Sequence, residues 1–275
     1  MIRVVSLVVS VAALGACTSN GQRIDRTASD AQLSRRVVTG TGYRHVIYLK
    51  DIDAAALGNS GGRMLVFLEG DGRPWIDDGR QRLPAVDPTT RNPIALQLLA
   101  RTNAPGIYIS RPCYQGLADR KCSSDTWTGG RYSREVVESL AAAVHTVAEE
   151  TGAREIVLVG YSGGGALAVL VAERTEKVAA VVTLGANLDI EAWTQEHRYL
   201  PLSTSLNPAA SDREHPWREL HLSGALDTVV PTATTAGYFE KYPAAKHWIM
   251  AQYDHVCCWV NDWPEVFARI QKELE

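Results

Sequence analysis

Short apolar runs alternate with longer amphipathic or polar segments along most of this chain. Short apolar runs bounded by glycine, proline or polar residues are typical of buried strands, whereas apolar residues at every third or fourth position indicate helices. We therefore expect helices over residues 91–100 and 133–150, and another after Ser162. The expected strands cover residues 36–39, 43–50, 63–69, 106–110, 155–159, 178–184, 219–223 and 246–251.

The order of these elements predicts the architecture. Only short turns separate the first strands, so they should pair antiparallel at one edge of a sheet. The later strands alternate with helices, as expected of βαβ crossovers in a doubly wound, mostly parallel sheet. The sequence thus predicts one α/β domain over residues 35–275, with an eight-stranded sheet. Residues 185–217 form a long connection that we expect to be a small cap over the site. The alternative is a loop that only extends over the protein surface.

The strongest chemical signal lies where the apolar run at 156–159 meets residues 160–164, which read Gly-Tyr-Ser-Gly-Gly. A G-x-S-x-G pentapeptide between a strand and a helix holds its serine on a sharp turn at the top of a sheet. Ser162 is therefore the candidate nucleophile. The backbone N–H of Gly163, at the start of the helix, is a candidate donor to an oxyanion.

A serine nucleophile needs a base and an acid that orients the base. Asp227 and His255 each lie just beyond a later predicted strand, and they are the leading acid and base. Asp189 and Asp254 remain alternatives for the acid. The other histidines placed to line a pocket are His197 and His215.

With these residues, the chain resembles the α/β-hydrolase superfamily from about Arg35 to its C-terminus. More narrowly, it is similar to lipid-anchored bacterial serine hydrolases of that fold. The resemblance implies that Ser162 is the nucleophile, Asp227 the acid and His255 the base.

The resemblance also implies that the turn after the strand at 63–69 supplies a second oxyanion donor, the N–H of Asp71. Glu69 departs from the superfamily pattern, because many members have histidine at this position. A carboxylate near an oxyanion is unfavourable unless it points away or is paired.

The activity implied by the resemblance is hydrolysis of carboxylic esters through an acyl-enzyme intermediate, with no metal or other cofactor. Amide, thioester and acyl-transfer chemistry use the same apparatus, so the fold does not choose among them. The contrasting hypothesis is a non-catalytic envelope protein that keeps the fold and binds a ligand or partner. The expected partner is a small acyl substrate, and a net charge of −3 gives no support for binding nucleic acid.

The first residues resemble a bacterial lipoprotein signal over residues 1–16. Arg3 carries a positive charge, an apolar run follows, and small residues precede Cys17. Cleavage would leave Cys17 as the lipid-bearing first residue; a secretory signal cut after Ala16 is the alternative. We expect residues 17–34 to be a polar tether and the protein to be lipid-anchored in the cell envelope, at the outer membrane facing the periplasm in a diderm organism.

Four cysteines follow Cys17, and export to an oxidising compartment favours disulfides. Cys113 and Cys122 close a short loop and are the expected pair. Cys257 and Cys258 would then form an adjacent disulfide or remain two thiols. A metal site built from these cysteines and His255 would occupy the expected base and lacks paired C-x-x-C spacing, so none is expected.

Overall fold

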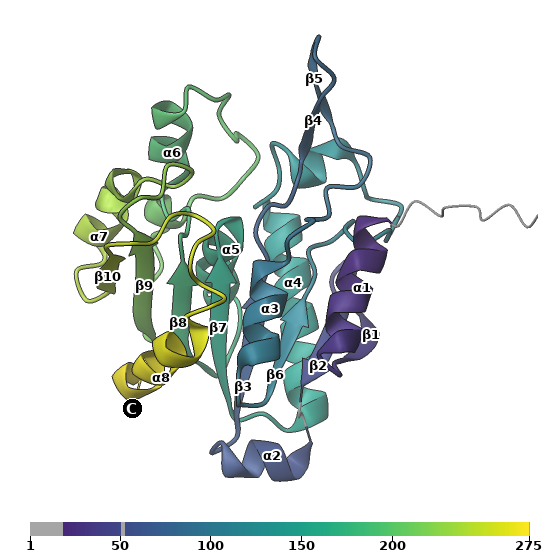
Figure 1. Cartoon of the computed structure of the whole chain (residues 1–275), viewed down its shortest axis with the longest axis vertical. Helices are drawn as coiled ribbons and strands as arrows, with labels where there is room; N and C mark the ends of the chain where they lie inside the picture. The colour runs from purple at the N-terminus through teal and green to yellow at the C-terminus, as the bar shows by residue number, and fades with distance from the viewer. Residues whose placement is uncertain (1–18, 51–52, 275) are drawn as a thin grey trace, which may run out of the picture.

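The computed structural model describes residues 19–50 and 53–274, which fold around an eight-stranded sheet (Figure 1). Its strands, from one edge to the other, are β1 (Ser34–Thr39), β2 (Arg44–Lys50), β6 (Gly106–Ile109), β3 (Arg63–Leu68), β7 (Glu155–Tyr161), β8 (Val178–Leu184), β9 (Arg218–Gly224) and β10 (Lys246–Met250). β2 is antiparallel to both β1 and β6, and from β6 to β10 all neighbours are parallel. The predicted sheet, with its antiparallel edge, is confirmed.

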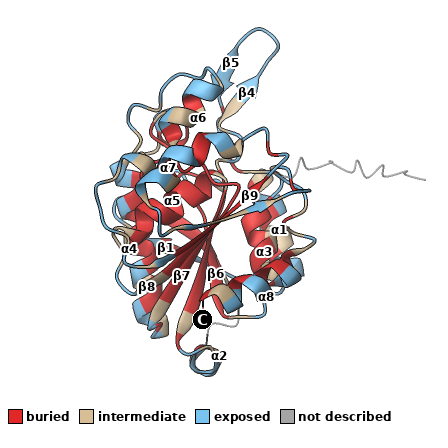
Figure 2. Ribbon diagram, turned by 90° about the vertical axis from the view of Figure 1, so that its left-hand side faces the viewer, coloured by how far each residue is buried: buried red, intermediate tan, exposed pale blue. Residues whose placement is uncertain are grey.

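Helices cover both faces of the sheet. On one face lie α4 (Arg134–Thr151) and α5 (Gly163–Ala172); on the other lie α1 (Asn20–Asp30), α3 (Ile94–Arg101) and α8 (Trp263–Leu274). Figure 2 shows that the central strands and the inward sides of these helices are buried, whereas the edge strands β1 and β10 are exposed or half-buried over most of their length. Because successive side chains of a strand point to opposite faces, strands enclosed in this way are apolar on both sides.

The remaining elements are short. They are the helices α2 (Ala54–Asn59), α6 (Ile190–Glu196) and α7 (Ala236–Lys241), the 3₁₀ turns at 124–127, 208–210 and 232–235, and the hairpin of β4 (Trp75–Asp77) and β5 (Arg82–Pro84). The hairpin, which the sequence does not predict, projects from the end of the molecule toward which β7, β8 and β9 point (Figure 1).

The segment expected to be a polar tether contains α1. The Ser19 hydroxyl accepts the Gln22 N–H at 3.2 Å, and the Gln22 side chain accepts the Ser19 N–H at 2.8 Å. This reciprocal cap fixes the start of the helix. Ile24 and Ala28, one turn apart, are buried in the core beneath α1 and α3. Most of the segment therefore belongs to the folded domain, and the prediction of a tether is wrong for these residues.

The predicted signal at 1–16 and the lipid-bearing Cys17 lie outside the described residues. Within the described ranges, none of the helices has both the length and the apolar character needed to cross a bilayer.

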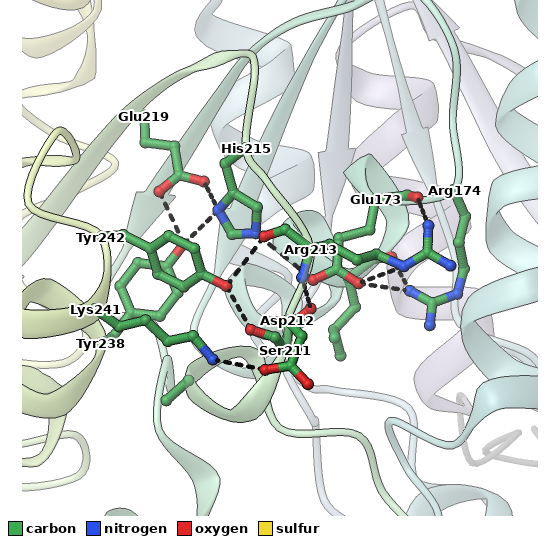
Figure 3. Close-up of polar contacts among 12 residues, drawn as sticks. Glu173, Arg174, Ser211, Asp212, Arg213, His215, Glu219, Tyr238, Lys241 and Tyr242 are labelled. Atoms are coloured by element: carbon green, nitrogen blue, oxygen red, sulfur yellow. Dashed lines mark hydrogen bonds and ion pairs between the residues drawn. The ribbon is translucent and has the colours of Figure 1, made fainter.

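A buried ionic cluster fastens the end of the 185–217 segment to the domain (Figure 3). The His215 ring stacks on the Tyr242 ring, with centroids 4.0 Å apart. His215 Nδ1 lies 2.7 Å from a Glu219 carboxylate oxygen, and Nε2 lies 3.6 Å from Glu173 Oε1. Burial alone would lower the pKa of His215, but the two carboxylates outweigh it and raise the pKa to about 9.

We expect His215→Gln to lower the free energy of unfolding by roughly 1–3 kcal/mol at pH 6. The folded-state pKa of about 9 exceeds the ordinary value of 6.5, so the contribution of the imidazolium is fully present below about pH 6.5. It is lost as the pH rises through about 9, and the difference between wild type and variant should then shrink. Urea unfolding across this range measures the difference. His145→Gln, at an exposed position of α4, is the control and should show no such trend.

Candidate active site

Ser162 stands at the junction between β7 and α5. Its backbone angles, φ 54° and ψ −126°, are rare for a residue with a side chain and cost about 1–3 kcal/mol. The flanking glycines allow the turn, because a Cβ on Gly160 would collide with the Gly164 backbone and a Cβ on Gly164 with the Leu68 carbonyl. The turn presents a partly exposed serine at the carboxyl end of the sheet, as the sequence predicts.

Ser162, His255 and Asp227 form one line of hydrogen bonds. His255 Nε2 lies 3.0 Å from Ser162 Oγ, and His255 Nδ1 lies 2.8 Å from Asp227 Oδ2. The buried Asp227 carboxylate also accepts the N–H groups of Val229 and Val230 through Oδ1, each at 2.8 Å. A neutral His255 that donates from Nδ1 to the carboxylate accepts a proton at Nε2, which is the tautomer a general base requires.

The loop that carries His255 is held by its backbone. The His255 carbonyl accepts Tyr161 Oη at 2.9 Å and Trp259 Nε1 at 3.1 Å. Tyr161 directly precedes Ser162, so the same strand end positions both the serine and the histidine loop.

The two alternative acids have other partners. One Asp189 oxygen accepts two N–H groups in the first turn of α6, each at 3.2 Å, and so caps that helix. Asp254 accepts two backbone N–H groups of the following loop, at 2.7 and 2.6 Å. Of the three acids, Asp227 alone has a hydrogen bond to His255 within the described residues.

Asp71 and Gly163 lie against each other beside Ser162. A Cβ on Gly163 would collide with the Asp71 carboxylate, and a Cβ on Gly70 would lie 3.2 Å from Ser162 Cβ. The Gly163 N–H belongs to the first turn of α5, where backbone donors have no acceptor within the helix. The Asp71 N–H donates to no other group in the part of the chain that the structure describes. The structure therefore places Asp71 and Gly163, which carry the two predicted donors, in contact through the Asp71 carboxylate.

The Asp71 side chain lies in an ionic cluster that sequence reasoning missed. Arg131 donates to Asp71 Oδ2 at 2.7 Å, Tyr132 Oη lies 2.8 Å from both carboxylate oxygens, and Arg111 donates to Oδ1. The Arg111 and Arg131 side chains are only 2% and 7% exposed. Tyr114 Oη donates to the Asp71 carbonyl at 2.9 Å. These contacts fix Asp71 through both its side chain and its backbone.

The charges of this cluster leave a small positive excess next to Gly163. Burial alone would raise the pKa of Asp71, but Arg131 and Arg111 outweigh it and hold the pKa well below its usual range. The carboxylate therefore stays ionised between two guanidinium groups. The positions of the two arginines are a weak signal for this cluster in the sequence. Arg111 directly follows the predicted strand at 106–110, and Arg131 lies two residues before the predicted helix at 133–150.

Glu69, the departure from the superfamily pattern, is buried and bonded to backbone N–H groups. Its Oε1 accepts the Gly70 N–H at 3.2 Å and the Ala95 N–H, at the start of α3, at 3.4 Å. Burial raises the pKa of Glu69 to about 7. The carboxylate in contact with Gly163 is therefore that of Asp71, whose charge is neutralised by Arg111 and Arg131.

Both cysteine pairs are joined in the structure. Cys113 and Cys122 form the expected disulfide, with Cα atoms 5.7 Å apart. Cys257 and Cys258, which the sequence leaves open, are also joined, two residues beyond His255. Among the described residues, no group of three or more His, Cys, Asp or Glu side chains is placed to hold a metal ion.

Comparisons with known proteins agree with this architecture. Residues 121–210 match the family model for the alpha/beta hydrolase fold. The whole structure is similar to an esterase from Pyrococcus furiosus, with a TM-score of 0.62 and 13% identity over 90% of this chain and 91% of that one. An alpha-beta serine hydrolase homologue from Coxiella burnetii gives a TM-score of 0.56 and 14% identity over 88% and 97% of the two chains.

A third solved structure, an esterase/lipase from an uncultured bacterium, gives a TM-score of 0.55 and 12% identity over 96% of this chain and 93% of that one. A search among curated proteins found no match. At these identities the likeness shows the fold, and the fold expected from the sequence is confirmed.

Proposed function

We propose that this member of the α/β-hydrolase superfamily is a serine hydrolase that cleaves carboxylic esters through an acyl-enzyme intermediate. The observation that carries the proposal is the line of hydrogen bonds from Ser162 through His255 to the buried Asp227. The strained turn at Ser162 adds support, because backbone strain of this kind gathers at functional sites.

In the proposed first step, His255 Nε2 takes the proton of Ser162 Oγ as that oxygen attacks the ester carbonyl. Asp227 stabilises the imidazolium that forms and keeps the ring in place. The N–H groups of Gly163 and Asp71 receive the negative charge that develops on the carbonyl oxygen. His255 then gives the proton to the departing alkoxide, which leaves as an alcohol and produces the acyl-enzyme.

In the second step, water replaces the alcohol. His255 takes a proton from the water, whose oxygen attacks the acyl carbonyl, and the same two N–H groups receive the oxyanion. Collapse of the intermediate returns the proton to Ser162 and releases the carboxylic acid. Arg111 and Arg131 support both steps, because without them the Asp71 carboxylate would repel an oxyanion formed at Gly163.

Esters are the proposed substrates because an alkoxide needs less assistance to leave than an amine does. A fluorophosphonate probe tests the chemistry without knowledge of the natural substrate. We expect one covalent adduct, which peptide mass spectrometry should locate on Ser162, and none after denaturation of the protein. A folded protein that remains unlabelled would favour the non-catalytic envelope protein instead.

We further propose that the protein is exported and anchored by lipid on Cys17, because residues 1–16 resemble a lipoprotein signal that ends just before this cysteine. Cys17→Ser should move the protein from the membrane fraction to the soluble envelope fraction, since the acyl chains supply the stable attachment. Fractionation with immunodetection measures the shift, and mass analysis of the N-terminal peptide identifies the lipid. A wild-type N-terminal peptide without lipid would instead indicate an ordinary secreted protein.

A further inference from the structure

The large apolar side chains that remain exposed gather at the end of the molecule that carries the proposed active site. Ile76, Leu83 and Val86 lie on or next to the β4–β5 hairpin, and Tyr199 and Leu200 follow α6. Val86 is 92% exposed and Leu200 86%. Figures 1 and 2 show this exposed hairpin projecting beyond the domain. We call these five residues the apolar rim.

The loops around the rim add to the same surface. Further exposed apolar residues adjoin Asp227 and His255, and these are Leu226, Val229 and Val256. Among the described residues, the other large apolar side chains with similar exposure are Val37 on β1 and Ile249 on β10. Single exposed apolar residues need no explanation, but a concentration around one site indicates an interaction surface.

A chain of contacts connects Asp227 to the rim. Val229 donates its N–H to Asp227, and its carbonyl accepts Trp193 Nε1 at 2.7 Å and His197 Nε2 at 2.9 Å. The His197 ring stacks on the Tyr199 ring, with centroids 5.1 Å apart. The part of the rim that follows α6 is therefore held in place by the loop of the catalytic acid.

The β4–β5 hairpin also contacts Tyr199. The Arg82 guanidinium lies 5.9 Å from the centre of the Tyr199 ring. The base of the hairpin is closed by the hydrogen bond from Ala85 N–H to the Pro74 carbonyl, at 2.9 Å, shortly after Asp71 in the chain. The rim thus extends from the loop of the acid to the loop of a proposed oxyanion donor.

The described chain also begins at this end. Asn20 Nδ2 donates to the Thr89 carbonyl at 2.9 Å, and Thr89 lies three residues beyond Val86. Cys17 precedes Asn20 by three residues, which span at most about 11 Å. A lipid on Cys17 would therefore hold this end of the domain close to the bilayer.

The charge of the rim suits a membrane surface. Residues 73–86 and 196–200 carry one more exposed cation than anions, although the whole chain has a net charge of −3. The exposed charged residues of these two segments are Arg73, Arg80, Arg82 and Arg198, against Asp77, Asp78 and Glu196. Arginines near anionic headgroups are attracted to the surface, and apolar side chains beside them insert at the boundary of the acyl chains.

From these observations we propose that the apolar rim docks on the lipid bilayer, and that the substrate is an acyl ester held in that membrane. The proposal rests on the function and on the Cys17 anchor proposed above. With the rim on the bilayer, Ser162 faces the membrane, and the acyl chain of a lipid ester enters the site without crossing water.

Docking is tested by fluorescence quenching, independently of catalysis. The full chain, carrying Ser162→Ala to keep the lipids intact, is placed on phosphatidylethanolamine–phosphatidylglycerol vesicles that contain brominated lipid. An environment-sensitive label attached through Val86→Cys should lose at least about half of its fluorescence. The control label, attached through Ala55→Cys on α2 at the opposite end of the molecule (Figure 1), should lose little. No quenching at position 86, or equal quenching at both positions, would overturn the proposal.

The substrate class is tested by a ratio of activities. The double variant Val86→Ser with Leu200→Ser is assayed on a long-chain ester held in vesicles and on a soluble short-chain ester. We expect the ratio of the first activity to the second to fall about fivefold to tenfold relative to wild type. The control Val37→Ser should leave the ratio unchanged, and an unchanged ratio in the double variant would refute the membrane-held substrate. If neither ester is cleaved by the wild type, the proposed function fails, while the quenching result still decides docking.

Discussion

Ser162→Ala is expected to reduce ester hydrolysis by at least about three orders of magnitude. The reason is chemical, because Ser162 Oγ is the atom that forms the acyl bond and His255 has no other nucleophile to activate in the described site. The oxyanion donors and the substrate contacts remain, so a small residual rate over the uncatalysed reaction is expected. The measurement is kcat and KM on a soluble short-chain ester, with fluorophosphonate labelling as a second readout.

The fold should survive this change. Alanine has a Cβ as serine does, so the strained backbone at φ 54° is neither relieved nor made worse. The Ser162 side chain is a partner of His255 and not part of the packed core. Ser203→Ala, at an exposed position, is the matched control and should keep full activity. Activity within about tenfold of wild type in a folded Ser162→Ala protein would end the proposed mechanism.

The strands of the sheet were predictable because the burial of a strand leaves a pattern within that strand's own residues. Strands covered on both faces must be apolar on both sides, and β3, β6, β7 and β8 stand out in the sequence for this reason. The edge strands β1 and β10 are exposed or half-buried over most of their length, and they are recognised as short runs bounded by polar or turn residues. The helix α1 was missed because only a few of its residues, among them Ile24 and Ala28, reach the core, and its remaining positions are mostly polar. The β4–β5 hairpin was missed because its strands are short and largely exposed, which leaves no hydrophobic period to detect.

The candidate site was predictable to the extent that its residues follow strand ends. Ser162, Asp227 and His255 each lie just past a parallel strand, and parallel strands bring their carboxyl ends to one edge of the sheet. Asp71 and Arg111 also follow strand ends, but no local pattern in the sequence shows that they contact each other and Arg131. Arg111 and Arg131 reach Asp71 from 40 and 60 residues away, and only the packing of the loops determines that they meet there.

The same cluster changes the interpretation of the acidic residues near the nucleophile. The sequence indicates Glu69 as the carboxylate that would destabilise an oxyanion. In the structure, however, Glu69 accepts the Ala95 N–H at the start of α3. Asp71 has the closer carboxylate, and two buried arginines neutralise it. An anion at Gly163 therefore meets a small positive excess, which is the electrostatic condition that the proposed reaction requires.

Asp227→Asn is expected to reduce kcat by roughly three to four orders of magnitude. The structure indicates how the asparagine would lie. Its Oδ1 would keep the two backbone N–H groups of Val229 and Val230, which now bind Asp227 Oδ1. The amide nitrogen would then take the place of Oδ2 and donate to His255 Nδ1. His255 would hold its proton on Nε2, in the tautomer that cannot accept the proton of Ser162.

The same substitution at the alternative acids provides matched controls. Asn is as good a helix cap as Asp, so Asp189→Asn should keep α6 and most of the activity. Asp254→Asn keeps an oxygen for the two N–H groups of its turn and should also have little effect. Steady-state kinetics and the rate of fluorophosphonate labelling should both single out Asp227→Asn. If Asp189→Asn were instead the inactive variant, the assignment of Asp227 as the acid would be wrong. The roles of Ser162 and His255 would stand, because the hydrogen bond between them does not depend on which carboxylate orients the ring.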